Sequence, residues 1–141
     1  VRKMPRVSIN ASACGMSGEN PLPNAAICFS MSASKGGVSI NNSASRVASM
    51  SGDQMLANVQ IAGAGVSEAL LLGDVATVGY VMVKNMDAAN YIELGLDAPC
   101  TAQVFAKLLA GDFALFPAKT ATMYVLANSG PVNVLVQAVE V

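Results

Sequence analysis

Histidine, the side chain that most often moves protons in enzymes, is absent from the 141 residues. Its absence removes the commonest general base and the usual partner that activates a serine or cysteine nucleophile. Serine is abundant, and a Ser–Lys arrangement would need Lys84, Lys107 or Lys119 beside one of the serines. No local motif supports such a pair, so we expect no catalytic residue and no enzymatic activity.

Two pairs of acidic residues are the nearest candidates for glycoside hydrolysis, a reaction that uses two carboxylates on either side of a sugar bond. The pairs are Glu93 with Asp97 and Glu68 with Asp74. Nothing in the sequence places either pair in a cleft, and the chain has no tryptophan on which a sugar ring would stack. We therefore interpret these carboxylates as solvated turn residues.

Two further patterns suggest ligand binding but supply too few of the residues that such a site needs. Gly63, Gly65 and Glu68 resemble the opening of a phosphate-binding GxGxxG motif, but a glutamate stands in the place of the third glycine. Asp87 and Asn90 could give oxygens to calcium, which takes about six to eight of them. We expect turns at both places, with neither a cofactor nor a metal.

The three cysteines, Cys14, Cys28 and Cys100, are an odd number at wide spacings. This arrangement fits neither a disulfide framework nor a CxxC metal or redox motif. The sequence therefore predicts three reduced, buried thiols.

The overall composition is unusually poor in charge. Hydrophobic residues make up 53% of the chain and charged residues 12%, with a mean hydropathy of +0.50, whereas ordinary domains are about 25% charged. So few charges would cover the surface of a monomer poorly, which favours a homo-oligomer. The alternative is that the excess is mostly alanine and valine scattered over the surface, where they are harmless.

Charge and hydropathy also bear on partners. The net charge is −1, and Arg2, Lys3 and Arg6 form the one basic cluster, so we expect no nucleic-acid partner. No apolar run reaches the roughly 18 residues that span a bilayer, so we expect no membrane segment. Residues 7–13 are interrupted by polar side chains and do not form the apolar region of a signal peptide.

Alternation of apolar and polar residues with a period of two recurs along the chain and predicts β-strands almost throughout. Lys35, Gly36 and Gly37 predict a hairpin turn, and residues 66–72 are the one plausible helical turn. The expected strands lie at residues 27–34, 38–40, 55–61, 80–84, 91–94, 104–109, 113–116 and 123–127, with a last strand from residue 132 to the C-terminus.

Eight or nine short strands at this spacing indicate an all-β chain with a single antiparallel β-sandwich or jelly-roll-like domain. We expect this domain to span residues 25–141. Residues 1–24, which contain three prolines, are expected to form an extended N-terminal arm.

Residues 68–141 resemble a group of small virion proteins of tailed bacteriophages. The resemblance follows the stretches EALLLGDVATVGYVMVKNMDAANYIELG, FAKLLAGDFALFP and MYVLANSGPVNVLVQAVEV. It is a succession of strand and turn residues with no chemical signature. The matching positions are Gly79, Lys84, Asn85, Asp87, Asn90, Tyr91, Leu108, Gly111, Asp112, Pro117 and Ala127.

This resemblance implies a non-enzymatic structural protein of the virion, assembled in the host cytoplasm. A capsid decoration (cement) protein that stabilises the phage head is the first hypothesis. Its partners would be the major capsid protein or other virion subunits, and threefold lattice sites favour a trimer. The alternatives are a tail or shell subunit that self-assembles, and a receptor- or glycan-binding module on a head or tail fibre.

Overall fold

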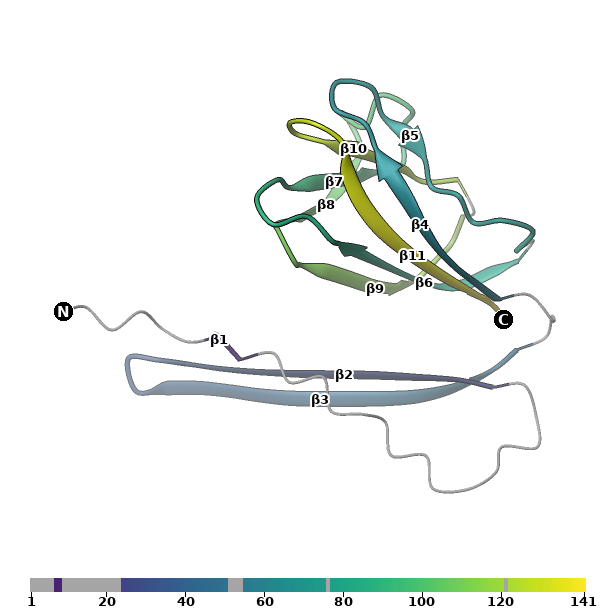
Figure 1. Cartoon of the computed structure of the whole chain (residues 1–141). Helices are drawn as coiled ribbons and strands as arrows, with labels where there is room; N and C mark the ends of the chain where they lie inside the picture. Colours follow the sequence, from purple (N-terminus) through teal and green to yellow (C-terminus); the bar gives the residue numbers. More distant parts are fainter. Residues whose placement is uncertain (1–6, 9–23, 51–54, 76, 121) are drawn as a thin grey trace. The chain divides into compact units, whose positions relative to one another are not determined.

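The structure is a computed structural model that describes residues 7–8, 24–50, 55–75, 77–120 and 122–141. The chain divides into two compact units, a first unit of Val1–Met50 and a second unit of Ser51–Val141 (Figure 1). All regular secondary structure in the described residues is β, and every pair of neighbouring strands is antiparallel. The prediction of an all-β, antiparallel chain is confirmed. Within these same residues, no helix has the length and hydropathy to cross a membrane.

The first unit is a long β-hairpin with a short third strand. Strand β1 (Val7–Ser8) pairs with β2 (Asn24–Lys35), which pairs along its whole length with β3 (Val38–Ser49). Gly36 and Gly37 connect β2 to β3 with φ angles of 59° and 81°. A tight hairpin turn needs positive φ at both positions, which glycine adopts without strain, so the predicted turn is confirmed.

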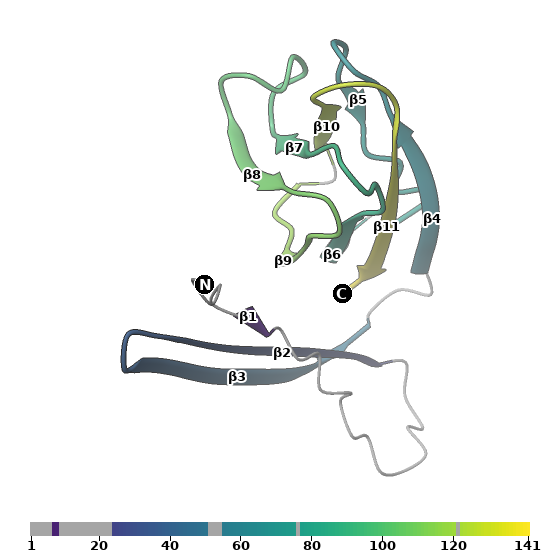
Figure 2. The same ribbon diagram turned by 60° about the vertical axis from the view of Figure 1, so that its left-hand side comes forward.

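The second unit contains two four-stranded sheets, whose strands can be followed in Figure 2. The first sheet has the order β5 (Glu68–Ala69), β10 (Tyr124–Ala127), β7 (Ile92–Gly95), β8 (Val104–Leu108). The second has the order β4 (Met55–Ala62), β11 (Val132–Glu140), β6 (Val78–Asn85), β9 (Phe113–Pro117). The helical turn expected at residues 66–72 is wrong, because Glu68–Ala69 pairs with β10 instead.

The hydrophobic core of the second unit draws side chains from both sheets. On β11, Val132, Val134 and Val136 are completely buried, while the residues between them point the other way. Ile92 and Leu94 of β7 join the same cluster from the other sheet. Successive side chains of a strand point to opposite faces, so this alternation puts one face of each sheet into a shared interior.

A buried asparagine fixes the turn that follows β6. Asn85 is completely buried, and its amide nitrogen donates to the carbonyls of Asn90, Leu108 and Leu109 at 2.8, 3.1 and 3.1 Å. Its side-chain oxygen accepts the N–H of Asp87 at 2.9 Å. One side chain therefore ties the turn after β6 to the end of β8.

The expected division into an arm of residues 1–24 and a domain of residues 25–141 stays a prediction. Apart from β1 and Asn24, the arm lies outside the described residues. Strand β2 begins at Asn24, the last residue of the expected arm.

Candidate assembly surfaces

The outer face of the sheet β4-β11-β6-β9 is almost entirely apolar. The strand register places Val59 of β4, Leu135 of β11, Lys84 of β6 and Phe113 of β9 in one row across the sheet. Lys84 is the one charged residue among the described residues of this face, and Asn133 and Gln137 are its other polar ones. The apolar members of the face are Met55, Ala57, Val59, Ile61, Tyr80, Met82, Phe113, Leu115, Pro117, Leu135 and Val139.

Much of this outer sheet face is open to solvent. Met55 is 70% exposed, Ile61 58% and Val59 52%. Phe113 and Leu115 of β9 are also exposed. The four apolar residues that the central strands β6 and β11 contribute to this face are half-buried. Contiguous apolar surface of this extent on a folded domain usually marks a site of association.

The β2–β3 hairpin has one apolar face and one small polar face. Its register places Phe29 opposite Ala44 and Ala33 opposite Ile40 on the apolar side. The other side carries serine and asparagine from both strands, including Ser30 opposite Ser43. The hairpin's apolar face consists of Ala25, Ile27, Phe29, Met31, Ala33, Val38, Ile40, Ala44 and Ala48, with Lys35, Asn42 and Arg46.

The apolar face of the hairpin is also uncovered. Val38 is 68% and Ile40 51% exposed, and Phe29 and Met31 are exposed as well. Ala48 is the single buried residue among the described residues 25–50. Among the described residues the third strand, β1, adds only two residues to this hairpin. A two-stranded hairpin is marginal by itself, because three or more strands or a packing partner are needed to bury enough apolar surface.

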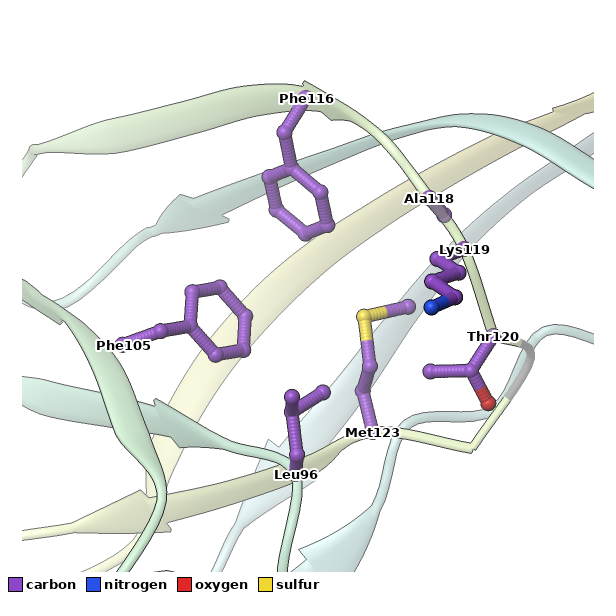
Figure 3. A pocket seen from close by; sticks show the side chains of 7 residues that line it. All are labelled: Leu96, Phe105, Phe116, Ala118, Lys119, Thr120 and Met123. Carbon is purple, nitrogen blue, oxygen red and sulfur yellow. The ribbon is translucent and has the colours of Figure 1, made fainter.

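A pocket of about 340 Å³ lies between β8 and β9, the edge strands of the two sheets of the second unit. Phe105 and Phe116 form one wall, with ring centroids 5.5 Å apart in an edge-to-face arrangement (Figure 3). Leu96, Ala118 and Met123 complete the apolar lining, and Lys119 and Thr120 supply its polar atoms. The lining contains neither a carboxylate nor a thiol, so it suits an apolar group better than any acid–base chemistry.

The three lysines considered as partners of a serine nucleophile lie on separate elements. Lys84 is on the outer sheet face of β6, and Lys119 lines the pocket. The ammonium of Lys107 lies 3.8 Å from the centroid of the Tyr91 ring, a cation–π contact. No arrangement of the described residues brings these lysines together into one site.

The acidic residues considered for sugar or calcium chemistry are used in turns. Asp87 accepts the N–H groups of Ala89 and Asn90, both at 2.7 Å. Asp97 accepts the N–H groups of Thr101, Ala102 and Gln103 at 3.1, 3.1 and 2.8 Å. Among the described residues, no group of three or more acidic or cysteine side chains is placed to hold a metal ion.

The remaining candidates lie near one another without forming a site. Gly65 has a φ of 79° and lies in the connection between β4 and β5, while Glu68 is the first residue of β5. A side chain at Gly63 would come within 3.2 Å of the Glu68 carboxylate, so the two residues are close. Asp74 lies in an exposed turn.

The prediction of three reduced thiols is wrong for Cys28, which is disulfide-bonded. Cys100 is free and buried, in agreement with the prediction. Burial raises the pKa of the Cys100 thiol, and the nearby carboxylates of Asp97 and Glu93 raise it further, which makes the thiol unreactive.

The hydrogen bonds to Asp97 predict a dependence of stability on acid. The N–H of Thr101 is the largest cause that lowers the pKa of Asp97 in the folded chain. A folded-state pKa below the unfolded value of about 3.9 adds stability above that pH, and this is lost as the pH falls through the lower folded value. We expect Asp97→Asn to flatten the fall in melting temperature between neutral pH and pH 2.

Thermal unfolding followed by circular dichroism over this pH range measures the effect. Asp74→Asn is the matched control, because the Asp74 carboxylate accepts no hydrogen bond within the described residues. Equal slopes for Asp97→Asn and the unsubstituted chain would contradict the role given to this turn.

Compared with known proteins, the chain matches no family model, no curated protein and no solved structure. A function for this chain therefore has to be inferred from its own sequence and surfaces.

The residue pattern of the sequence does not identify the outer sheet face. Alternation shows which residues of a strand share a face but does not show which face is inside. A usable signal was present in residues 113–117, where apolar side chains occupy both faces of the strand. A strand that is apolar on both faces has to be covered on both, either within the chain or by a partner.

Proposed function

We propose that this chain is a non-enzymatic structural protein of a tailed-phage virion, and that it acts as a capsid decoration protein stabilising the head. In this role it would bind the major capsid protein or other virion subunits and also other copies of itself. Such a protein works by covering apolar surface, which contributes about 25 cal/mol per Å² removed from water. Binding only to the assembled particle would stabilise that particle by mass action.

The observation that carries this proposal is the pair of uncovered apolar faces. The outer sheet face exposes Met55, Val59 and Ile61, and the hairpin exposes Phe29 and Ile40. An isolated protein gains nothing from two such faces and risks aggregation. A subunit that packs among others in an assembly can bury both faces.

Two further features support the proposal. The two sheets of the second unit contribute to one hydrophobic cluster, which favours a β-sandwich of the kind expected from the sequence. The disulfide at Cys28 suits a protein exposed on a particle surface, because disulfides persist outside the reducing cytosol. The resemblance of residues 68–141 to tailed-phage virion proteins points in the same direction.

Light scattering of the purified chain, alone and with empty heads of the encoding phage, tests this function. We expect a discrete small oligomer, with a trimer favoured, that co-sediments with the heads. A stable monomer that remains in the supernatant would contradict both the oligomer and the capsid assignment.

A self-assembling tail or shell subunit is the second candidate, favoured by the outer edge of β3, along which no other strand of the described residues pairs. This strand offers 12 residues to a neighbour with Arg46 as its one charge and no proline. Edge strands are usually protected by charge, proline or a bulge, and an unprotected one invites pairing with another chain. Tubes or sheets formed by the purified protein, seen by negative-stain microscopy, would favour this candidate.

A further inference from the structure

We propose that copies of this chain join head to tail. The apolar face of the β2–β3 hairpin of one copy packs on the outer face of the β4-β11-β6-β9 sheet of the next. This inference rests on the proposed function and names the surfaces that a structural subunit would use for self-association. Three pairings of the two faces are conceivable: hairpin on hairpin, sheet on sheet, and hairpin on sheet. The spacing of charged positions and the use of both faces of every copy favour the third.

The two units carry opposite charge. The first unit, residues 1–50, has five basic residues and one acidic residue, whereas residues 51–141 have three basic and eight acidic residues. The two apolar faces themselves carry only cations, Lys35 and Arg46 on the hairpin and Lys84 on the sheet. Attraction between opposite charges therefore has to come from acidic residues at the borders of the sheet face.

The charged positions on the two faces also have matching spacings. On the hairpin, Arg46 lies opposite Ile27, and Lys35 lies eight residues further along β2. At about 3.3 Å per residue, the two cations are about 26 Å apart along the hairpin. An apolar segment that contains Phe29, Met31, Ala33 and Ile40 separates them.

Carboxylates border the outer sheet face at both ends. Asp87 follows β6 and Asp112 precedes β9 at one end, and Glu140 ends β11 at the other. Strand β11 extends over nine residues, so these ends are also about 26 Å apart. A hairpin laid along the sheet would bring one cation near each acidic end, with its apolar segment over the apolar centre.

Estimated areas favour an arrangement that uses both faces of every copy. Strands 4.8 Å apart give the 12-residue hairpin a face of about 400 Å² and the four-stranded sheet a face of about 500 Å². Either face alone is well below the roughly 800 Å² per partner of a standard interface. In a head-to-tail ring each copy uses both faces in two separate contacts, each limited by the hairpin to about 400 Å² per partner, and closure of the ring has to add to the stability of each contact.

Head-to-tail contacts are heterologous, so they close into a ring or continue as a filament. In a ring, both apolar faces of every copy take part in a contact. A symmetric dimer through either face would leave the other apolar face of each copy exposed to water.

Two lysine substitutions, one on each face, test the inference. Ile40→Lys places a charge on the apolar face of the hairpin, and Val59→Lys places one on the outer sheet face. Both side chains are at least half exposed in the chain itself, so neither substitution disturbs the core. The matched controls are Asn41→Lys, on the polar face of the same strand, and Ser129→Lys, in the exposed turn before β11.

Sedimentation velocity over a concentration series is the measurement. We expect the unsubstituted chain and both controls to form a closed oligomer, and Ile40→Lys and Val59→Lys to be monomeric. Mixing the two monomeric variants is the decisive step. The intact hairpin of the Val59→Lys chain can still bind the intact sheet of the Ile40→Lys chain, so the mixture is expected to form a heterodimer that neither variant forms alone.

The outcomes separate this inference from the proposed function. If the unsubstituted chain oligomerises and the mixture stays monomeric, the contact is symmetric or lies elsewhere, and the head-to-tail inference fails while the structural role stands. Oligomers that survive both lysine substitutions would overturn it in the same way. A monomeric unsubstituted chain would also overturn the head-to-tail inference, because no contact between copies would then exist. Binding to phage heads would in that case decide the proposed function separately.

Discussion

Replacing Asn85 by aspartate is expected to destabilise the second unit by about 3 kcal/mol. Asn85 is completely buried, and its two amide hydrogens are shared among the carbonyl oxygens of Asn90, Leu108 and Leu109. A carboxylate has no hydrogen to offer and would face three oxygens. The change keeps the shape of the side chain, so the loss measures hydrogen bonding rather than packing.

Chemical denaturation with urea at pH 7 measures the loss, and Asn41→Asp is the matched control. Asn41 is exposed on the polar face of β3, where the same change should cost almost nothing. The introduced carboxylate at position 85 is buried, which raises its pKa, so protonation restores one donor as the pH falls. The deficit should therefore shrink towards pH 4. A deficit under 1 kcal/mol at pH 7 would mean that Asn85 does not hold the turn.

The positions of the strands could be predicted from the sequence because alternation depends on local residues. Strands β4, β6, β7, β8, β9, β10 and β11 all begin and end within a few residues of the expected ranges. The turn at Gly36 and Gly37 was equally readable, since its backbone conformation excludes most other residues. The alternation also showed correctly which residues of β2 share a face.

The side of a strand that is buried could not be read in the same way. On β4, Met55, Val59 and Ile61 look like core residues, yet they face outwards and Gln60 faces inwards. Gln60 is tolerated there because its amide donates to the carbonyl of Ala69 at 2.7 Å and its oxygen accepts the N–H of Leu71 at 3.0 Å. These contacts come from residues nine and eleven positions further along the chain, beyond the range of the alternation within β4.

The length of β3 and the role of Asn85 were missed for a related reason. Residues 41–49 are mostly serine, asparagine and alanine, which have weak strand propensity, and they form a strand because β2 supplies a partner along its whole length. Asn85 looks like an ordinary turn residue in the sequence. Its importance comes from carbonyls of Leu108 and Leu109, more than twenty residues away.

Replacing Gly95 by alanine is expected to cost about 1–3 kcal/mol, the range for overpacking a filled interior. An added Cβ at Gly95 would lie 2.8 Å from the sulfur of Cys100 and 3.2 Å from its Cα. The sulfur is not free to move, because Cys100 is buried and its backbone is held in the left-handed region at a φ of 52°. The clash therefore has to shift the turn at residues 96–100 or strand β7.

A double-mutant cycle separates the clash with the Cys100 sulfur from the loss of backbone flexibility that any replacement of glycine causes. Cys100→Ala removes the sulfur and keeps the backbone conformation, so it should recover much of the cost of Gly95→Ala when the two are combined. The interaction energy from urea denaturation of the four chains is expected to be favourable by about 1 kcal/mol, in the range for residues in contact. Additive effects would show that the sulfur does not limit the space at Gly95. In that case the Cα of Cys100 would be the limit, and only a displacement of the turn could accommodate a side chain there.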